Sequence, residues 1–349
     1  MSILFAAAEV GSFNAIYPCF DRLSKNYECF FFPTELAKKN CSSKTLLCSA
    51  IEDKNDIVNI ILDRKISALI YSININKSEI YYLSKICKRE GIPLIHILDY
   101  WNGYIERLSL NDEIIFPDYY LVPDEKAFEE SIRNGIPSRI IQILGNPSFA
   151  NYLKYYENLM TNAPPDSNKQ NKLAFIAEPV LLDQGDESSK NYRGYTEYSV
   201  LKLLSDLLKK TSGITIDIFP HPRQNISDLE EFINNRNNPS LKINLKGSFL
   251  EKIMDYSGVM GMSSTVLYEA WLFGMRVISI QPNLKNHSLF ESMNRDGITL
   301  ITKTDDIEEK IRVWVEKTLK STNKNVLKYR ELGHHASSLD KIESIIVNL

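Results

Sequence analysis

The sequence alternates short apolar runs with segments of helical spacing, and it does so twice. In the first half the apolar runs are residues 2–8, 29–33, 45–51, 66–73, 93–99, 119–123 and 140–144. In the second half they are residues 173–177, 215–219, 242–245, 258–262, 277–281 and 299–302. Strands that alternate with helices form βαβ units, and such units build parallel sheets. The predicted fold class is therefore α/β, with two Rossmann-like, doubly wound parallel-sheet domains.

A polar segment, TNAPPDSNKQNK at residues 161–172, separates the two halves. It carries two prolines and lacks apolar periodicity, which is typical of a linker. We therefore expect an N-terminal domain at 1–162, a C-terminal domain at 172–325 and C-terminal helices at 326–349. In these last helices Ile342, Ile345, Ile346 and Leu349 form an apolar face at helical spacing. That face suits packing either on the N-terminal domain or on the helices' own domain.

Charge and motif content exclude several classes of protein. Lys and Arg number 41 and Asp and Glu 44, and this near-neutral balance argues against a dedicated nucleic-acid binder. GxGxxG and Walker A motifs are absent from the sequence, which argues against NAD, FAD and P-loop chemistry. The five cysteines form no CxxC pair, and the first residues lack the basic region of a signal peptide. We therefore expect a cytoplasmic protein with reduced thiols and without a metal or cofactor.

The lysine-rich segment 317–328 has two interpretations. It is either a solvated helix face or a peripheral contact with an anionic membrane or lipid-linked acceptor.

Ligands bind parallel sheets at the carboxyl ends of the strands, so the residues that follow each strand are the candidate site. The strand at 215–219 ends in Pro220-His221-Pro222-Arg223, where His221 and Arg223 can donate hydrogen bonds to a phosphate. The alternative is a proline-rich surface turn.

The strand at 258–262 leads directly into Ser263-Ser264-Thr265 and then a helix. Hydroxyls and free backbone N–H groups at a helix start bind anions, although one serine also suffices as a plain N-cap. Glu269, inside that helix, either reaches a ribose hydroxyl or is solvated.

Two further residues of this half follow a strand or a polar loop. Glu178 follows the strand at 173–177 and is predicted to contact the nucleotide. Tyr195 stands between the loop 180–194 and a helix that begins at Thr196, and it is predicted to contact the sugar.

In the N-terminal half, the strand at 2–8 ends in Glu9, Gly11 permits a tight turn, and Ser12 or Asn14 can cap the helix that follows. Gly11 and Asn14 are also predicted to contact the acceptor or sugar. The strand at 93–99 ends in a carboxylate beside aromatic residues, a pattern typical of sugar sites. The residues of this second group are Asp99, Tyr100, Trp101 and Asn102. The alternative is a half-buried aromatic loop.

These residues resemble the GT-B glycosyltransferases, above all the bacterial sialyltransferase-like members. Those enzymes carry an HP motif and a Ser-Ser motif that bind the phosphate of a CMP-activated sugar acid. His221-Pro222 and Ser263-Ser264 match them in type, order and domain. The runs SSTVLYEAWLFGMRVISIQP and DYWNGY…PDYYLVPDEKA…GIPSRIIQILGNP also look like GT-B sequence. The acidic motif of the sialyltransferases has no clean copy here.

The chain resembles the non-hydrolysing sugar-nucleotide 2-epimerases more distantly. Their histidine-glutamate-glycine signature does not follow the strand at 93–99, where DYWNGY stands instead.

The resemblance implies two domains facing a central cleft and metal-independent transfer of a nonulosonic acid of sialic, pseudaminic or legionaminic type. The donor would be a CMP-sugar, and the acceptor a surface glycan, a lipid-linked glycan or a protein. His221, Ser263 and Ser264 would stabilise the charge that develops on the leaving phosphate, and Asp99 or Glu9 would deprotonate the acceptor.

The alternatives are a UDP-sugar glycosyltransferase or a UDP-N-acetylglucosamine 2-epimerase-like enzyme on the same fold. A third alternative is a binding module without catalysis.

Overall fold

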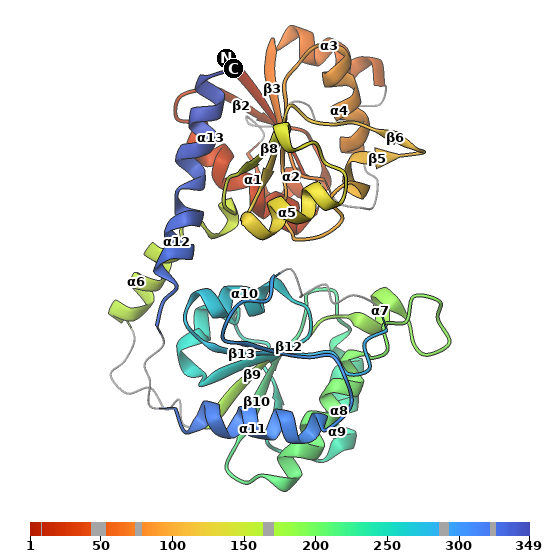
Figure 1. Ribbon diagram of the computed structural model, residues 1–349, viewed down its shortest axis with the longest axis vertical. Coiled ribbons are helices and arrows are strands. Elements are labelled where there is room, and N and C mark those ends of the chain that lie inside the picture. Colours follow the sequence, from red (N-terminus) through yellow and green to blue (C-terminus); the bar gives the residue numbers. More distant parts are fainter. Residues whose placement is uncertain (8, 43–53, 74–78, 163–170, 286–292, 322–325) are drawn as a thin grey trace. The chain divides into compact units, whose positions relative to one another are not determined.

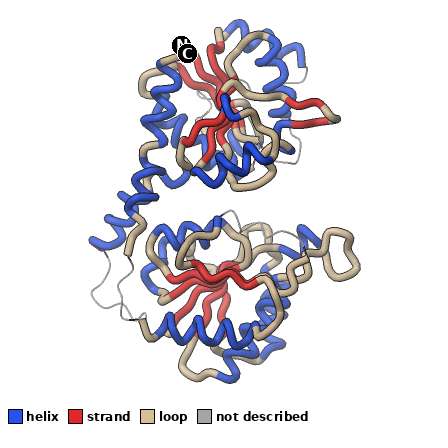
Figure 2. Tube along the Cα trace, viewed as in Figure 1, coloured by secondary structure: helices blue, strands red, loops and turns tan. Residues whose placement is uncertain are grey.

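A computed structural model describes residues 1–349 apart from 8, 43–53, 74–78, 163–170, 286–292 and 322–325 (Figure 1). The contacts between residues divide the chain into two compact units. The N-terminal unit comprises Met1–Lys154 with Arg330–Leu349, and the C-terminal unit comprises Tyr155–Tyr329. Each unit is built around one six-stranded sheet with helices packed against it (Figure 2).

The strands of the N-terminal unit are β1 (Ser2–Ala6), β2 (Glu28–Phe31), β3 (Ile66–Tyr71), β4 (Leu94–Ile97), β7 (Tyr119–Val122) and β8 (Ile141–Ile143), with a separate hairpin of β5 (Ser109–Leu110) and β6 (Glu113–Ile114). Its helices are α1 (Val10–Leu23), α2 (Glu35–Asn40), α3 (Lys54–Asp63), α4 (Glu79–Arg89), α5 (Glu125–Arg133), α12 (Tyr329–Ala336) and α13 (Ser338–Val347), with the 3-10 helices η2 (Glu106–Leu108), η3 (Ser138–Ile140) and η4 (Pro147–Phe149). The sheet order is β2-β1-β3-β4-β7-β8, and every pair in it is parallel.

Alternate side chains of each strand enter two different cores in this unit. In β1, Ile3 and Phe5 belong to the core that α1 and α13 cover, whereas Leu4 and Ala6 belong to the core on the side of α3 and α4. Successive strand residues point to opposite faces, so both faces must be apolar when helices cover both. This is why the strand runs of the sequence are almost continuously hydrophobic.

The C-terminal helix α13 packs against the first helix of the chain. Ile342 and Ile346 are buried in the same core as Phe13, Ile16 and other residues of α1. At the rim of this contact, Arg22 of α1 forms ion pairs with Asp340 and Glu343 of α13. The tail is therefore part of the N-terminal unit, although about 175 residues of the C-terminal unit precede it in the chain.

Ile342→Ala is expected to lower the free energy of unfolding of the N-terminal unit by about 2–5 kcal/mol, because truncation of a fully buried side chain leaves a cavity. Hydrogen exchange of the β1 amides measures this change in the unit concerned. Val347→Ala is the matched control, since Val347 lies on the same helix with 68% of its surface exposed. Equal losses in the two variants would contradict the packing described here.

The strands of the C-terminal unit are β9 (Lys172–Ile176), β10 (Thr215–Phe219), β11 (Leu241–Ile243), β12 (Gly258–Gly261), β13 (Arg276–Ile280) and β14 (Ile298–Ile301). Its helices are α7 (Val180–Gln184), α8 (Glu197–Lys210), α9 (Ile226–Arg236), the 3-10 helix η5 (Leu250–Asp255), α10 (Thr265–Leu272) and α11 (Ile307–Leu319), and α6 (Tyr152–Asn162) spans the boundary between the units. The sheet order is β11-β10-β9-β12-β13-β14, again with parallel pairs throughout.

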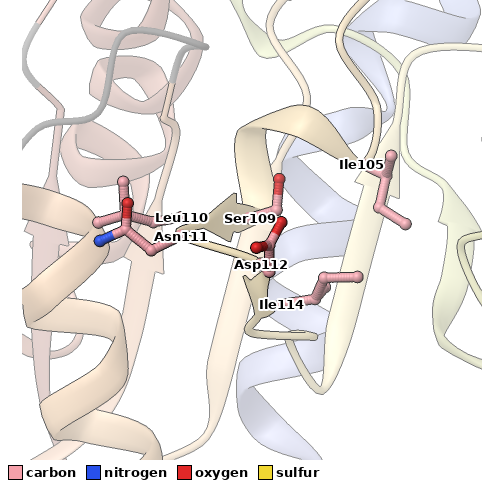
Figure 3. A pocket seen from close by; sticks show the side chains of 6 residues that line it. All are labelled: Ile105, Ser109, Leu110, Asn111, Asp112 and Ile114. Atoms are coloured by element: carbon pink, nitrogen blue, oxygen red, sulfur yellow. The ribbon is translucent and has the colours of Figure 1, made fainter.

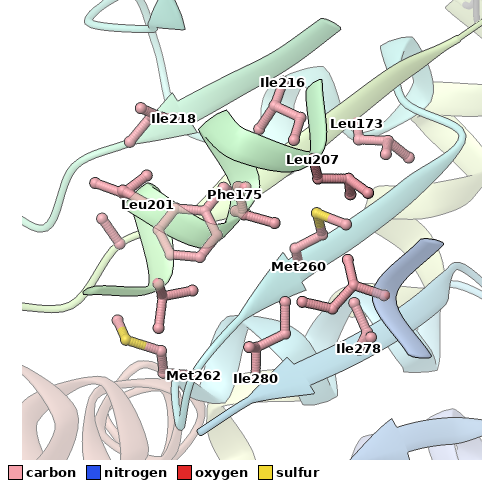
Figure 4. Packing of buried hydrophobic residues seen from close by; sticks show 14 of the residues in the cluster. Leu173, Phe175, Leu201, Leu207, Ile216, Ile218, Met260, Met262, Ile278 and Ile280 are labelled. Carbon is pink, nitrogen blue, oxygen red and sulfur yellow. The ribbon is translucent and has the colours of Figure 1, made fainter. Parts of the chain in front are cut away.

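One face of this second sheet forms an extensive hydrophobic core. Phe175, Met260, Met262, Ile278 and Ile280 project from the strands onto apolar side chains of the covering helices (Figure 4). The helices that supply those side chains are α8, α9 and α11. This packing fixes the carboxyl ends of β9, β12 and β13 beside one another.

Both sheets reverse their strand order once, and these points locate the candidate sites. The order changes direction between β1 and β3 in the N-terminal sheet and between β9 and β12 in the C-terminal sheet. Loops that leave such a point run in opposite directions and open a crevice at the carboxyl ends of the two strands.

The predicted α/β fold class, with two doubly wound parallel sheets, is confirmed. The domain ranges 1–162, 172–325 and 326–349 stay predictions. The expected strand at 45–51 lies outside the described residues. The expected loop at Gly11 is wrong: α1 begins at Val10, and Gly11 lies in its first turn. Asn14 is an exposed residue within the helix rather than its cap. Among the described residues, no helix is long and apolar enough to cross a membrane.

Candidate functional site

The two strands at the reversal point of the C-terminal sheet bring Glu178 and Ser263 together. Ile176 pairs with Gly261 in the β9–β12 register, so the residues two positions further on face each other. The carboxylate of Glu178 accepts the backbone N–H of Ser263 at 2.6 Å and its hydroxyl at 2.8 Å. Ser263 is buried, with 3% of its surface exposed. The donors after β12 thus form a cradle for an anion, and a side chain of the protein occupies it.

Of the two roles predicted for Ser264, anion binding and helix capping, the structure shows helix capping. It is the N-cap residue of α10, and its hydroxyl accepts the backbone N–H of Val266 at 3.2 Å. Thr265, the first residue of the helix, is half-buried. The two serines therefore have different roles. Ser264 caps α10, and Ser263 donates hydrogen bonds to the carboxylate of Glu178.

The environment of Glu178 combines burial with compensating hydrogen bonds. Burial raises the pKa of its carboxyl, while the Ser263 hydrogen bonds and the positive charge of Arg193 oppose that shift. Arg193 is half-buried and lies on the loop between α7 and α8. Neighbouring Gly194 has φ +100°, and a Cβ there would lie 1.8 Å from the carbonyl oxygen of Asn283. The loop is therefore held closely against the segment after β13.

Tyr195 supports this cluster from inside the unit rather than from its surface. Its side chain is fully buried, and its hydroxyl donates to the Oε1 atom of Gln281 at 3.4 Å. Gln281 in turn donates to the backbone oxygen of Met262 at 3.0 Å, immediately before Ser263. Burial, and secondarily the charge of Glu178, raise the pKa of Tyr195 to about 12. The prediction that Tyr195 contacts sugar is not supported, because the residue has no exposed surface.

His221 follows β10, next to β9 in the sheet. Its Nδ1 accepts the backbone N–H of Arg223 at 3.2 Å, so in the neutral ring the proton is assigned to Nε2. Burial and the charge of Arg223 lower the pKa of His221, which favours that neutral form. The ring is half-buried, whereas Pro222 beside it is exposed. His221 is therefore suited to donate a hydrogen bond from Nε2 rather than to supply a positive charge.

Arg223 is exposed and forms an ion pair with a residue of α7. Its guanidinium forms a two-pronged ion pair with the carboxylate of Asp183, at 2.6 and 2.8 Å. Its two terminal nitrogens are directed at Asp183, and phosphate binding by this fork stays a prediction.

Glu269 is buried, with 9% of its surface exposed. Its neighbours in α10, Leu267 and Tyr268, are buried as well. The interpretation of Glu269 as a solvated helix residue is therefore wrong.

In the N-terminal unit a buried ion pair forms beyond the end of β4. The Asp99 carboxylate accepts a hydrogen bond from Arg107 at 2.6 Å on one oxygen and from the Ser12 hydroxyl at 3.3 Å on the other. The side chains of Arg107 and Asp99 are only 5% and 11% exposed. Gly11 lies against this carboxylate, because a Cβ there would stand 3.0 Å from Asp99 Oδ2.

Arg107 also orders the loop that contains the predicted sugar residues. It donates to the backbone oxygen of Asn102 at 3.0 Å and to its side-chain oxygen at 3.2 Å. Trp101 is 1% exposed, and its indole N–H donates to Asp124 at 2.7 Å. Trp101 is therefore enclosed, whereas Tyr100 and Asn102 are half-buried, and the sugar contacts predicted for these residues stay predictions. Glu9 is the exposed N-cap residue of α1.

Two residues of these clusters, Arg107 and Arg193, were not predicted. Arg107 follows the aromatic loop in the run GYIER, where an arginine after aromatic residues is too common a pattern to single out. Arg193 precedes a glycine, and only the positive φ of Gly194 explains why the loop turns there.

A separate pocket of about 460 Å³ lies at the β5–β6 hairpin (Figure 3). It is lined by Ile105, Ser109, Leu110, Asn111, Asp112 and Ile114. The only charged group in this lining is a carboxylate, so the pocket is not suited to a phosphate. Among the described residues, no group of three or more His, Cys, Asp or Glu side chains could hold a metal ion.

The sequence matches no protein-family model and no curated protein. Solved structures do resemble the chain. The UDP-GlcNAc 2-epimerase from Methanocaldococcus jannaschii aligns with a TM-score of 0.66 and 16% identity, over 99% of this chain and 100% of that one. The UDP-N-acetylglucosamine 2-epimerase from Rickettsia bellii gives 0.66 and 16%, over 100% and 96%.

A third structure, the UDP-GlcNAc 2-epimerase from Neisseria meningitidis bound to UDP-GlcNAc, gives 0.66 and 14%, over 99% and 100%. At such identities the likeness establishes the fold, and the chain has the two-domain, GT-B-like architecture of these proteins.

Proposed function

We propose that this chain is an enzyme that acts on a nucleotide sugar and binds the nucleotide's phosphate at Ser263 and the start of α10. The observation that carries the proposal is the bound carboxylate of Glu178. Two donors of one residue hold it at 2.6 and 2.8 Å, at the point where the C-terminal sheet reverses its order. Donors that hold one oxyanion in this way suit another, because carboxylate and phosphate accept the same charge-assisted hydrogen bonds.

A UDP-sugar is the leading substrate class. The supporting observation is the fold, which spans the whole length of epimerases whose structures contain UDP-GlcNAc or UDP. The comparisons give no such support to a CMP-linked nonulosonic acid. CMP-sugar transfer is therefore the second candidate, and it rests on the order of His221-Pro222 and Ser263-Ser264 alone. The glycan, lipid-linked or protein acceptor that such a transfer needs stays a prediction.

In the proposed chemistry the C-terminal unit stabilises the nucleotide as a leaving group. As the bond between sugar and phosphate breaks, negative charge grows on the phosphate oxygens. Hydrogen bonds donated by Ser263 and by Nε2 of His221 stabilise that negative charge, most strongly in the transition state. Asp99 and Glu9 stay the predicted bases. Asp99 is the better ordered of the two, because Arg107 and Ser12 hold its carboxylate.

Incubation of the pure protein with UDP-N-acetylglucosamine alone tests the reaction, because an epimerase needs no acceptor. We expect either the 2-epimer or, with a glycan acceptor added, release of UDP. Turnover of CMP-sialic acid, with UDP-N-acetylglucosamine left intact under both conditions, would move the assignment to the second candidate. No turnover of either, together with nucleotide binding, would indicate a binding module.

A further inference from the structure

The carboxylate of Glu178 already fills the position proposed for the nucleotide's phosphate. It uses both donors of Ser263 at once, the N–H with Oε2 and the hydroxyl with Oε1. A plain helix start needs neither bond, because Ser264 already caps α10. The β9–β12 register brings the two residues opposite each other, so the contact is set by the sheet and not by a flexible loop.

We propose that Glu178 occupies the phosphate cradle as an internal anion and that a nucleotide must displace its carboxylate from Ser263 in order to bind. The inference rests on the proposed function, since it concerns the same donors. A phosphate oxygen and a carboxylate oxygen cannot both accept the single N–H of Ser263 in a short, well-aligned bond. They also repel each other at such a distance. Glu178 therefore lowers the affinity for nucleotide and selects ligands that form enough other contacts to replace it.

The surroundings of Glu178 make such an exchange feasible. Glu178 as a residue is half-buried rather than fully enclosed. The positive charge of Arg193 acts on it from the loop before α8 and would still act on it after displacement. Burial of the carboxyl opposes its charged form, so the bound state is less favourable than two short hydrogen bonds alone would suggest.

Calorimetric titration of the full chain with UDP, and in parallel with CMP, tests the inference. Glu178→Gln keeps the size of the side chain but removes its charge, and Glu178→Ala removes the internal anion altogether. We expect the first to tighten nucleotide binding about tenfold and the second at least as much. Glu187→Gln is the matched control, because it removes one carboxylate from an exposed position on the loop that follows α7. It should leave the dissociation constant unchanged.

The outcomes separate the inference from the proposed function. If the wild type binds nucleotide and both Glu178 variants bind it equally or more weakly, Glu178 is a ligand or a structural residue and the inference is wrong. If the variants bind nucleotide and the wild type does not, the inference is supported in its strongest form. If no form binds either nucleotide, the proposed function fails and the inference fails with it. Thermal unfolding of each variant establishes that it is folded.

Discussion

His221→Ala and Ser263→Ala are each expected to lower the turnover of the nucleotide sugar by about 10²–10³-fold, the usual effect of removing one donor from an oxyanion site. Nε2 of His221 and the Ser263 hydroxyl are the proposed donors to the leaving phosphate. Their loss raises the barrier more than it weakens ground-state binding, so the effect should appear in kcat as well as in kcat/KM.

Two further variants make this result interpretable. Ser227→Ala removes an exposed hydroxyl from the first turn of α9 and should leave turnover unchanged. His221→Gln places an amide N–H near the position of Nε2 and should recover part of the lost rate. Wild-type turnover in both alanine variants would place the phosphate elsewhere in the protein.

Arg107→Ala is expected to destabilise the N-terminal unit by about 3–5 kcal/mol, because it leaves the carboxylate of Asp99 buried without its charged partner. The same change removes the bonds to Asn102 and to the backbone oxygen of Ile73 at 2.8 Å. Urea denaturation, combined with hydrogen exchange of the β4 amides, measures the loss in this unit.

Lys88→Ala is the control for that prediction. Lys88 pairs with Asp118 at 2.7 Å, but the two side chains are 46% and 42% exposed. An exposed pair contributes about 1 kcal/mol or less. If the two variants lost similar stability, the ion pair of Arg107 would not be the buried support that the structure describes.

The architecture was predictable because both sheets are covered on both faces. A strand such as β1, with Ile3 and Phe5 on one face and Leu4 and Ala6 on the other, leaves a continuous apolar run in the sequence. The rule that ligands bind at carboxyl ends then placed Glu178, His221 and Ser263 among the candidates. Which of these residues contact one another was not predictable. The contact between Glu178 and Ser263 depends on the pairing of β9 with β12, and the two residues are 85 positions apart in the chain.

Burial is what the sequence shows least well in the candidate site. Trp101 follows a strand and Tyr195 follows a polar loop, and both have side chains suited to sugars, yet both are enclosed and donate their polar hydrogens inside the protein. Composition does not distinguish an aromatic residue that lines a site from one that supports it. Gly11 was predicted to form a turn, because glycine favours turns. In the structure its lack of a side chain lets α1 approach Asp99.

The most direct test of the central claim is a calorimetric titration of the full chain with UDP and CMP, repeated with Ser263→Ala. We expect the wild type to bind UDP more tightly than CMP, and loss of the Ser263 hydroxyl to weaken UDP binding at least tenfold. Binding of CMP alone would contradict the choice of UDP-sugar. Binding of UDP that is unaffected by Ser263→Ala would contradict the phosphate site itself.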